Sequence, residues 1–220
     1  MGMNKQKGNM YGFVTHTWNP IRGKCYHDCS YCYMKKIKGA FDVEPHIVEK
    51  EFKTNLGSGN NIFVGSSTDM WGKWIPEEWI RRVLDYIKQF PENQYLLQTK
   101  NPLRFADFTA CYSDNMILCT TAESSTVWDR LVILKTIKEQ LKVKTAITIE
   151  PVMDFDFRLF LDLLIDCDPV WIAIGANTSN VKLKEPTPEK LDKLIHRLAY
   201  HGIKLHLKDN LKRIFESKGE

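Results

Sequence analysis

The hydrophobic positions of this chain follow two patterns that alternate along its length. Short apolar runs rich in β-branched and aromatic residues predict strands, and stretches with a helical period separate them. The predicted strands are Phe13–Trp18, Asn61–Ser66, Gln94–Thr99, Met116–Thr121, Thr145–Glu150, Val170–Gly175 and Ile203–Leu207. Strands that alternate with helices are typical of a parallel α/β fold.

The stretches between these strands have the apolar stripe of helices that cover a sheet. Glu77–Phe90 places apolar residues on one helical face. Three further helices are expected to begin at Thr126, Asp156 and Thr187, whose side chains are typical N-caps, and a short closing helix is expected from about Asn210 to Phe215. Six strand–helix units plus one extra C-terminal strand predict a partial (β/α)6 barrel rather than a closed barrel of eight units.

Composition and charge are those of an ordinary globular protein. The 220 residues are 43% hydrophobic and 26% charged, and no repeat or linker divides them, so we expect one domain over residues 1–220. No apolar run approaches the ~20 residues that span a bilayer, and no hydrophobic signal region opens the chain. We therefore expect a cytoplasmic protein without a membrane partner.

The net charge of +4 is compatible with a nucleic-acid partner but does not require one.

Three of the six cysteines, Cys25, Cys29 and Cys32, follow the first predicted strand with the spacing C-x₃-C-x₂-C. Four cysteines normally close a [4Fe–4S] cluster, so three thiolates leave one iron open to another ligand. The alternative is a zinc site made of these cysteines and His27. Structural zinc normally takes two ligand pairs separated by a loop, and no second pair follows. The cluster is the favoured interpretation, and the zinc site stays open as the alternative.

The other three cysteines, Cys111, Cys119 and Cys167, have no motif spacing. We expect each to be reduced and buried as a small hydrophobic side chain. Cys119 shares a face with Thr121 if their strand is regular. We expect Cys119 to point out of the barrel and into the core.

Polar residues lie at the ends of most of the predicted strands. Carboxyl ends of parallel strands meet at one edge of a sheet, where loops and helix N-termini converge and ligands bind. Because the first strand leads into the cysteines, we expect these residues to surround them. They are Ser66, Ser67, Thr68, Asp69, Lys100, Thr121, Glu123, Glu150, Gly175, Asn177, Lys208 and Asp209. Each also has a plainer explanation as a polar turn, a surface residue, a loop anchor or a helix cap.

The cysteine spacing, with Tyr31 directly before the third cysteine, resembles the signature of the radical S-adenosylmethionine (SAM) enzymes. Further motifs are similar to those of the phage-associated radical SAM proteins that resemble spore photoproduct lyase. These motifs span about residues 12 to 213 and are Thr17-Trp18-Asn19-Pro20, Gly65-Ser66-Ser67-Thr68-Asp69, Gln98-Thr99-Lys100-Asn101-Pro102, Ile149-Glu150-Pro151 and Lys208-Asp209-Asn210.

The resemblance implies a partial radical SAM barrel with a [4Fe–4S] cluster on Cys25, Cys29 and Cys32 and SAM on its open iron. A reduced cluster of this kind cleaves SAM to a 5′-deoxyadenosyl radical, which abstracts hydrogen from a substrate. The electron comes from an external one-electron reductant of the flavodoxin or ferredoxin type. A nucleic acid or nucleotide is the favoured substrate class. A partner protein, a peptide, a small metabolite and a non-catalytic zinc module that binds nucleic acid are the alternatives.

The same resemblance assigns roles to the residues at the strand ends. The SAM amino group is expected at Ser66–Asp69, the SAM carboxylate at Lys100, the ribose at Glu123, and the adenine near the backbone of Gly175 and Asn177. The remaining cofactor-binding candidates are Tyr31, Thr121 and Glu150, and the substrate candidates are Lys208 and Asp209. The lyases keep a hydrogen-donating cysteine at about the place of Ser66, so this chain departs from them there.

Overall fold

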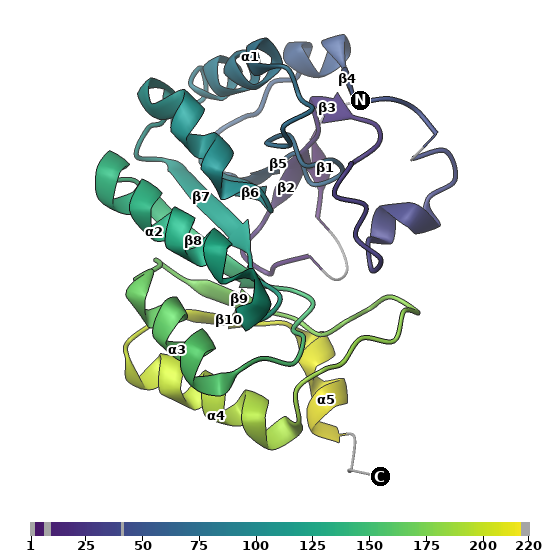
Figure 1. Cartoon of the computed structure of the whole chain (residues 1–220). Coiled ribbons are helices and arrows are strands. Elements are labelled where there is room, and N and C mark those ends of the chain that lie inside the picture. The colour runs from purple at the N-terminus through teal and green to yellow at the C-terminus, as the bar shows by residue number, and fades with distance from the viewer. Residues whose placement is uncertain (1–2, 7–9, 41, 217–220) are drawn as a thin grey trace.

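The computed structural model describes residues 3–6, 10–40 and 42–216 and contains a sheet with helices packed along it (Figure 1). Eight strands are ordered β1-β2-β5-β6-β7-β8-β9-β10. Seven of them are parallel, and β1 pairs antiparallel with β2. The strands are β1 (Asn4–Lys5), β2 (His16–Trp18), β5 (Asn61–Val64), β6 (Gln94–Thr99), β7 (Met116–Thr121), β8 (Lys144–Ile149), β9 (Ile172–Ile174) and β10 (Leu205–Leu207). A separate antiparallel pair is formed by β3 (Ile21–Arg22) and β4 (His46–Ile47).

All seven predicted strands are present, and β6 and β7 have the predicted bounds. The first strand, β2, is shorter than predicted. Residues 11–14 form a turn instead, in which the Val14 N–H donates to the Tyr11 carbonyl at 2.9 Å. The unpredicted strands β1, β3 and β4 have two residues each, which is too short for a hydrophobic period to be visible in the sequence.

The helices lie in the connections between the parallel strands, except for η5 and α5, which follow β10. The α-helices are α1 (Glu77–Ile87), α2 (Trp128–Leu141), α3 (Phe157–Asp166), α4 (Pro188–Tyr200) and α5 (Lys212–Glu216). The 3-10 segments are η1 (Tyr33–Lys36), η2 (Glu49–Lys53), η3 (Pro102–Cys111), η4 (Ser125–Val127) and η5 (Asp209–Leu211). In their described parts, the connections from β2 to β5 and from β6 to β7 contain 3-10 helices but no α-helix, and the first of them also contains β3 and β4, so the alternation is less regular than predicted.

Two of the three predicted N-caps are confirmed. Asp156 accepts from the N–H of the third residue of α3 at 2.8 Å, and Thr187 does the same for α4 at 3.3 Å. The prediction that Thr126 caps a helix is wrong. The Ser124 hydroxyl accepts from the Thr126 N–H at 3.2 Å and opens the turn η4, so that α2 begins two residues later, at Trp128.

The sheet has an apolar core on each face, because side chains alternate along a strand. The larger core lies between the sheet and the helices and includes Leu97, Leu118 and Ile147. The smaller core lies on the other, inner face, where Tyr11 and Cys119 pack together with side chains of the parallel strands. The expectation that Cys119 points outward is therefore wrong, because alternation puts it on the inner face with Thr121. Cys111, Cys119 and Cys167 are all buried, as predicted.

A substitution in the larger core should lower the free energy of unfolding strongly. Leu118 is fully buried in the central strand β7. We expect Leu118→Ala to cost about 2–5 kcal/mol, because it loses apolar burial and leaves a cavity. Leu103→Ala, at a side chain that is 61% exposed, is the control and should change stability by less than about 0.5 kcal/mol. Urea unfolding followed by circular dichroism measures both, and equal effects would contradict this description of the core.

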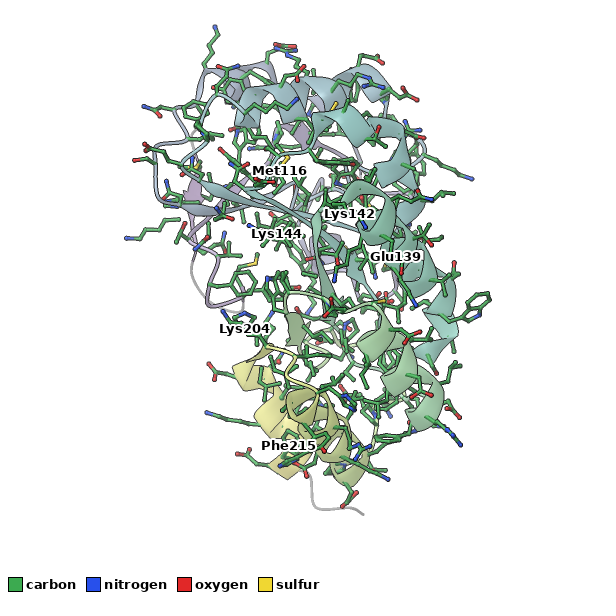
Figure 2. The ribbon with its side chains drawn as sticks, turned by 90° about the vertical axis from the view of Figure 1, so that its left-hand side faces the viewer. Met116, Glu139, Lys142, Lys144, Lys204 and Phe215 are labelled. Atoms are coloured by element: carbon green, nitrogen blue, oxygen red, sulfur yellow. The ribbon has the colours of Figure 1, made fainter. Side chains whose placement is uncertain are left out.

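The parallel strands all end on the side of the sheet that carries the cysteine loop, at the right of Figure 1. Figure 2 looks onto the opposite end, where Met116 and Lys144 begin β7 and β8 and Lys204 precedes β10. The carboxyl-terminal end of the sheet is therefore where the sequence-predicted site residues gather. No helix in the described ranges is long and apolar enough to cross a membrane.

Candidate functional site

The cysteine loop begins just after β3 at a position that only glycine fits. Gly23 has a φ of +105°, and a Cβ there would lie 2.4 Å from the Glu44 carbonyl oxygen. Two turns follow, in which the Asp28 N–H donates to the Cys25 carbonyl and the Cys32 N–H donates to the Cys29 carbonyl. Cys25, Cys29 and Cys32 are all half-buried, free thiols. The loop thus presents the three predicted ligands together.

Backbone N–H groups act to lower the pKa of two of these thiols. The N–H groups of His27 and Asp69 act on Cys25, and those of Met34 and Lys35 act on Cys32. Burial nevertheless raises the pKa of Cys25 to about 11, with the neighbouring Cys29 adding to the shift, and burial likewise raises the pKa of Cys32. The Lys100 ammonium acts against this shift at Cys32, because a positive charge favours the thiolate.

His27, the extra ligand of the zinc alternative, is held by other partners. Its Nε2 lies 2.8 Å from Asp69 Oδ2, and its ring packs edge-on against Trp74 with centroids 4.9 Å apart. Within residues 3–6, 10–40 and 42–216, no group of three or more His, Cys, Asp or Glu side chains is arranged to hold a single metal ion. In a cluster, by contrast, each thiolate binds a different iron atom, so the thiolates need not converge on one point.

The Asp69 carboxylate ties the cysteine loop to the ends of β5 and β6. Its Oδ2 accepts from His27, from the Thr99 hydroxyl at 2.9 Å and from the Lys100 N–H at 2.9 Å, and its Oδ1 accepts from the Trp71 N–H at 3.0 Å. Four donors on a carboxylate that is only 10% exposed leave little capacity for the predicted SAM ammonium. The geometry gives Asp69 a positioning role.

The serines before Asp69 keep acceptor capacity. The Ser66 and Ser67 hydroxyls donate to Asn19 Oδ1 at 3.1 and 3.2 Å, which leaves lone pairs on both hydroxyl oxygens. Thr68 is different, because it is buried and its hydroxyl donates to the Gly23 carbonyl at 2.6 Å. Ser66 and Ser67 are therefore the acceptors at this strand end that a ligand can reach.

A buried charged group, which we call the Glu123 cluster, consists of Tyr31, Lys100, Glu123 and Arg130. Glu123 Oε1 accepts from the Tyr31 hydroxyl and from the Lys100 ammonium, and Arg130 Nη1 donates to Oε2 at 2.9 Å. Burial by itself would raise the pKa of Glu123, but Lys100, Tyr31 and Arg130 outweigh it and lower the pKa. For Tyr31, burial and the Glu123 charge raise the pKa of the phenol. The cluster therefore holds an ionised carboxylate beside a neutral phenol.

Thr121 lies in a hydrogen-bonded row on the inner face rather than in the Glu123 cluster. Its hydroxyl accepts from Gln98 Nε2 at 3.0 Å and lies 3.1 Å from the Thr148 hydroxyl. Tyr11 lies beside this row, and its burial and the Glu150 charge raise its pKa although Gln98 and Thr148 act to lower it. Gln98 Oε1 is buried and has no hydrogen-bond partner within the described ranges.

Glu150 and Lys208 form an ion pair across the end of β9. Lys208 Nζ lies 2.6 Å from Glu150 Oε1 and 5.0 Å from the centre of the Tyr11 ring. Gly175 lies between these two side chains, and a Cβ there would come within 2.9 Å of Lys208 Cδ and 3.0 Å of Glu150 Cδ. Gly175 thus allows the charged side chains that directly follow β8 and β10 to meet.

Asn177 and Asp209 lie farther out, beside a groove of about 1020 Å³ between the loop after β9 and α5. The Asn177 side chain is bonded within its own loop, to the Val181 carbonyl at 2.7 Å and to the Ser179 N–H at 2.9 Å. Asp209 is exposed at the start of η5. The structure thus brings most of the predicted residues to one end of the sheet but separates these two from the Glu123 cluster.

Solved structures of spore photoproduct lyase have a fold similar to that of this chain. One variant of that enzyme superposes with a TM-score of 0.67 at 9% sequence identity, covering 92% of this chain and 78% of the lyase. The lyase in complex with dinucleoside spore photoproduct gives a TM-score of 0.66 at 9% identity with the same coverage. A variant with bound AdoMet and dinucleoside spore photoproduct gives 0.60 at 10% identity, again with the same coverage.

These superpositions define the class of fold, a partial radical SAM barrel of α/β architecture. The chain belongs to the family described as "Protein of unknown function (DUF5131)", whose model matches residues 10–209. A search of the curated proteins found no match.

Three residues of the site were not predicted from the sequence. Tyr11 reaches the inner face through the turn before β2, and an isolated tyrosine carries no motif. Gln98 belongs to the motif Gln98-Thr99-Lys100-Asn101-Pro102, but only the pleat of β6 shows that its side chain points to the inner face. The position of Arg130 in the sequence could have identified it as a site residue. A cation in the first turn of a helix opposes the helix dipole, which indicates that something other than the helix requires it there.

Proposed function

We propose that this protein is a radical SAM enzyme that binds a [4Fe–4S] cluster through Cys25, Cys29 and Cys32 and binds SAM beside it. One observation carries the proposal: the three thiols lie half-buried in one loop at the carboxyl-terminal end of a partial radical SAM barrel. The fold by itself does not indicate this function. The position of the three thiols at the carboxyl-terminal end of the sheet supports the proposed cluster.

The residues present fit the cluster. Three ligands leave one iron without a protein ligand, and N–H groups that donate to sulfur are a common means of tuning such clusters. When bound, the cluster passes an electron from an external flavodoxin- or ferredoxin-type reductant to SAM, which then yields methionine and a hydrogen-abstracting 5′-deoxyadenosyl radical. The protein's part is to bind, orient and shield the reactants.

The strand ends around the thiols supply contacts for each part of SAM. The Ser66 and Ser67 oxygens are acceptors for the ammonium, Lys100 is the cation for the carboxylate, and the Glu123 carboxylate accepts from the ribose hydroxyls. The adenine is proposed near the backbone of Gly175 and Asn177, beside the Glu150 and Lys208 side chains that approach Gly175. Asp69 and His27 hold the cysteine loop against these residues.

The proposed substrate is a nucleic acid or nucleotide. Two of the superposed lyase structures contain a dinucleoside spore photoproduct, and the net charge of +4 is compatible with an anionic substrate. Lys208 and Glu150 are the proposed contacts, because their ion pair lies beside the Tyr11 ring of the inner-face core. Incubation of reconstituted protein with SAM, dithionite and single-stranded oligonucleotides tests the substrate class. Oligonucleotide-dependent consumption of SAM supports it, and complete indifference to oligonucleotides would contradict it.

Metal content provides the direct test of the cofactor. We expect about four irons and four sulfides per chain after anaerobic reconstitution, because the three thiols would bind a cubane. Inductively coupled plasma analysis, a sulfide assay and electron paramagnetic resonance of the reduced protein measure this. Freshly isolated protein with one zinc in tetrahedral thiolate coordination would contradict the proposal and support the zinc alternative.

A further inference from the structure

Arg130 holds an unusual position for a cation. It is the third residue of α2, where the positive end of the helix dipole makes an arginine unfavourable for the helix itself. Its side chain runs back over the helix N-terminus, as helical side chains do, and is 21% exposed. Nη1 donates to the Thr121 carbonyl at 3.0 Å and to Glu123 Oε2 at 2.9 Å, so it connects the end of β7 to α2.

The charges of the Glu123 cluster do not balance. Lys100 and Arg130 contribute two positive charges and Glu123 one negative charge, so this set carries +1 among the described residues. Both cations are directed at the one carboxylate, which is 8% exposed. A ligand with a carboxylate would correct the imbalance by pairing with one of the cations. Lys100 is the mobile one, because its ammonium ends a flexible stem, whereas the Arg130 guanidinium is already held by two acceptors.

We propose that Arg130 is a positioning residue that keeps Glu123 ionised and oriented when SAM draws Lys100 away. This inference rests on the proposed function, since SAM is the ligand whose carboxylate takes Lys100. Before binding, Lys100 and Tyr31 share Glu123 Oε1, which blocks that oxygen. After binding, Lys100 pairs with the ligand carboxylate, Oε1 is free for the ribose hydroxyls, and Arg130 remains on Oε2. A buried carboxylate without Arg130 would lose its last cation at that step.

The binding of two ligands distinguishes the proposed positioning role of Arg130 from a purely structural role. SAM has a carboxylate and recruits Lys100, whereas 5′-methylthioadenosine has the adenosine but no amino-acid carboxylate. We expect Arg130→Gln to weaken SAM binding about 10- to 100-fold, the value of a hydrogen bond to a charged group. The same substitution should weaken 5′-methylthioadenosine binding by less than about threefold, because Lys100 then stays on Glu123.

The experiment is equilibrium dialysis of reconstituted protein with each labelled ligand under anaerobic conditions. Arg130→Lys restores the charge and should recover part of the SAM affinity. Lys135→Gln, which removes an exposed ion pair with Asp166 from the same helix, should change neither affinity. Iron content and circular dichroism confirm that each variant is folded and loaded, and Arg130→Lys carries the test if Arg130→Gln does not fold.

Three outcomes would overturn the proposal. Unchanged SAM affinity in Arg130→Gln shows that Glu123 needs no second cation. Equal weakening for both ligands shows that Arg130 only stabilises the local structure. If the wild-type protein with a full cluster binds no SAM, the proposed function itself fails, and this result is distinguishable from the first two because it does not involve Arg130.

Discussion

Replacing Cys29 by alanine is expected to abolish both the iron–sulfur cluster and SAM cleavage. Cys29 lies between the other two proposed ligands and close enough to raise the pKa of each. Two thiolates cannot hold a cube that normally takes four ligands and here has three. The measurement is iron and sulfide content after anaerobic reconstitution, together with the amount of 5′-deoxyadenosine formed from SAM with dithionite. Less than about a tenth of the wild-type iron is expected.

The remaining cysteines provide the controls for Cys29→Ala. Each is buried and makes its sulfur contact away from the cysteine loop: Cys111 with Arg81, Cys119 with the Thr120 carbonyl, and Cys167 with the Leu131 carbonyl. Alanine at any of the three should therefore leave the iron content and SAM cleavage intact. A loss of iron in one of them would show that the set of ligands is incomplete.

Replacing Lys100 by alanine should weaken SAM binding by about 1.5–3 kcal/mol, the value of one charge-assisted contact. Lys100 is 16% exposed and lies at the end of β6, where a ligand carboxylate can take it from Glu123. The substitution keeps the backbone N–H that Asp69 accepts, so the cysteine loop and the iron content should not change. Equilibrium dialysis of SAM against reconstituted protein measures the effect.

A variant elsewhere on the surface shows whether the effect of Lys100→Ala is specific. Lys138→Ala removes an exposed contact with Asp168 at the far end of α2 and should leave the SAM affinity unchanged. Equal SAM affinity in Lys100→Ala and in the wild-type protein would mean that Lys100 serves only to compensate the Glu123 charge. Loss of iron in Lys100→Ala would mean instead that its effect reaches the cluster.

The strands were predicted well because their physical signal is local. β6 and β7 are buried on both faces and read as continuous apolar runs that end in polar residues, so their bounds agree with the pattern. The N-cap of the helix after β7 was predicted incorrectly for a local reason as well. Ser124 and Thr126 are both good caps, and only the turn at the end of β7 decides between them.

The cysteine spacing and the polar strand ends indicated where the candidate site lies but not how its parts are connected. The prediction that Asp69 accepts the SAM ammonium followed from its place after the second strand, and it stays a prediction. What the sequence did not indicate is that its carboxylate accepts from three segments of the chain, including His27, which lies 42 positions before it. Such pairing depends on how loops pack at the sheet end, and no pattern within one segment encodes it.

The sequence by itself determined the order of the seven parallel strands, the burial of Cys111, Cys119 and Cys167, and the placement of three thiols between the first two of these strands. These follow from local periodicity and spacing. Only the tertiary structure decided that Cys119 faces inward, that Asp69 holds the cysteine loop, and that Lys100 and Arg130 meet on Glu123. Those contacts join residues from different strands and helices, and their geometry is set by the curvature of the sheet and by the electrostatic cost of leaving a buried charge unpaired.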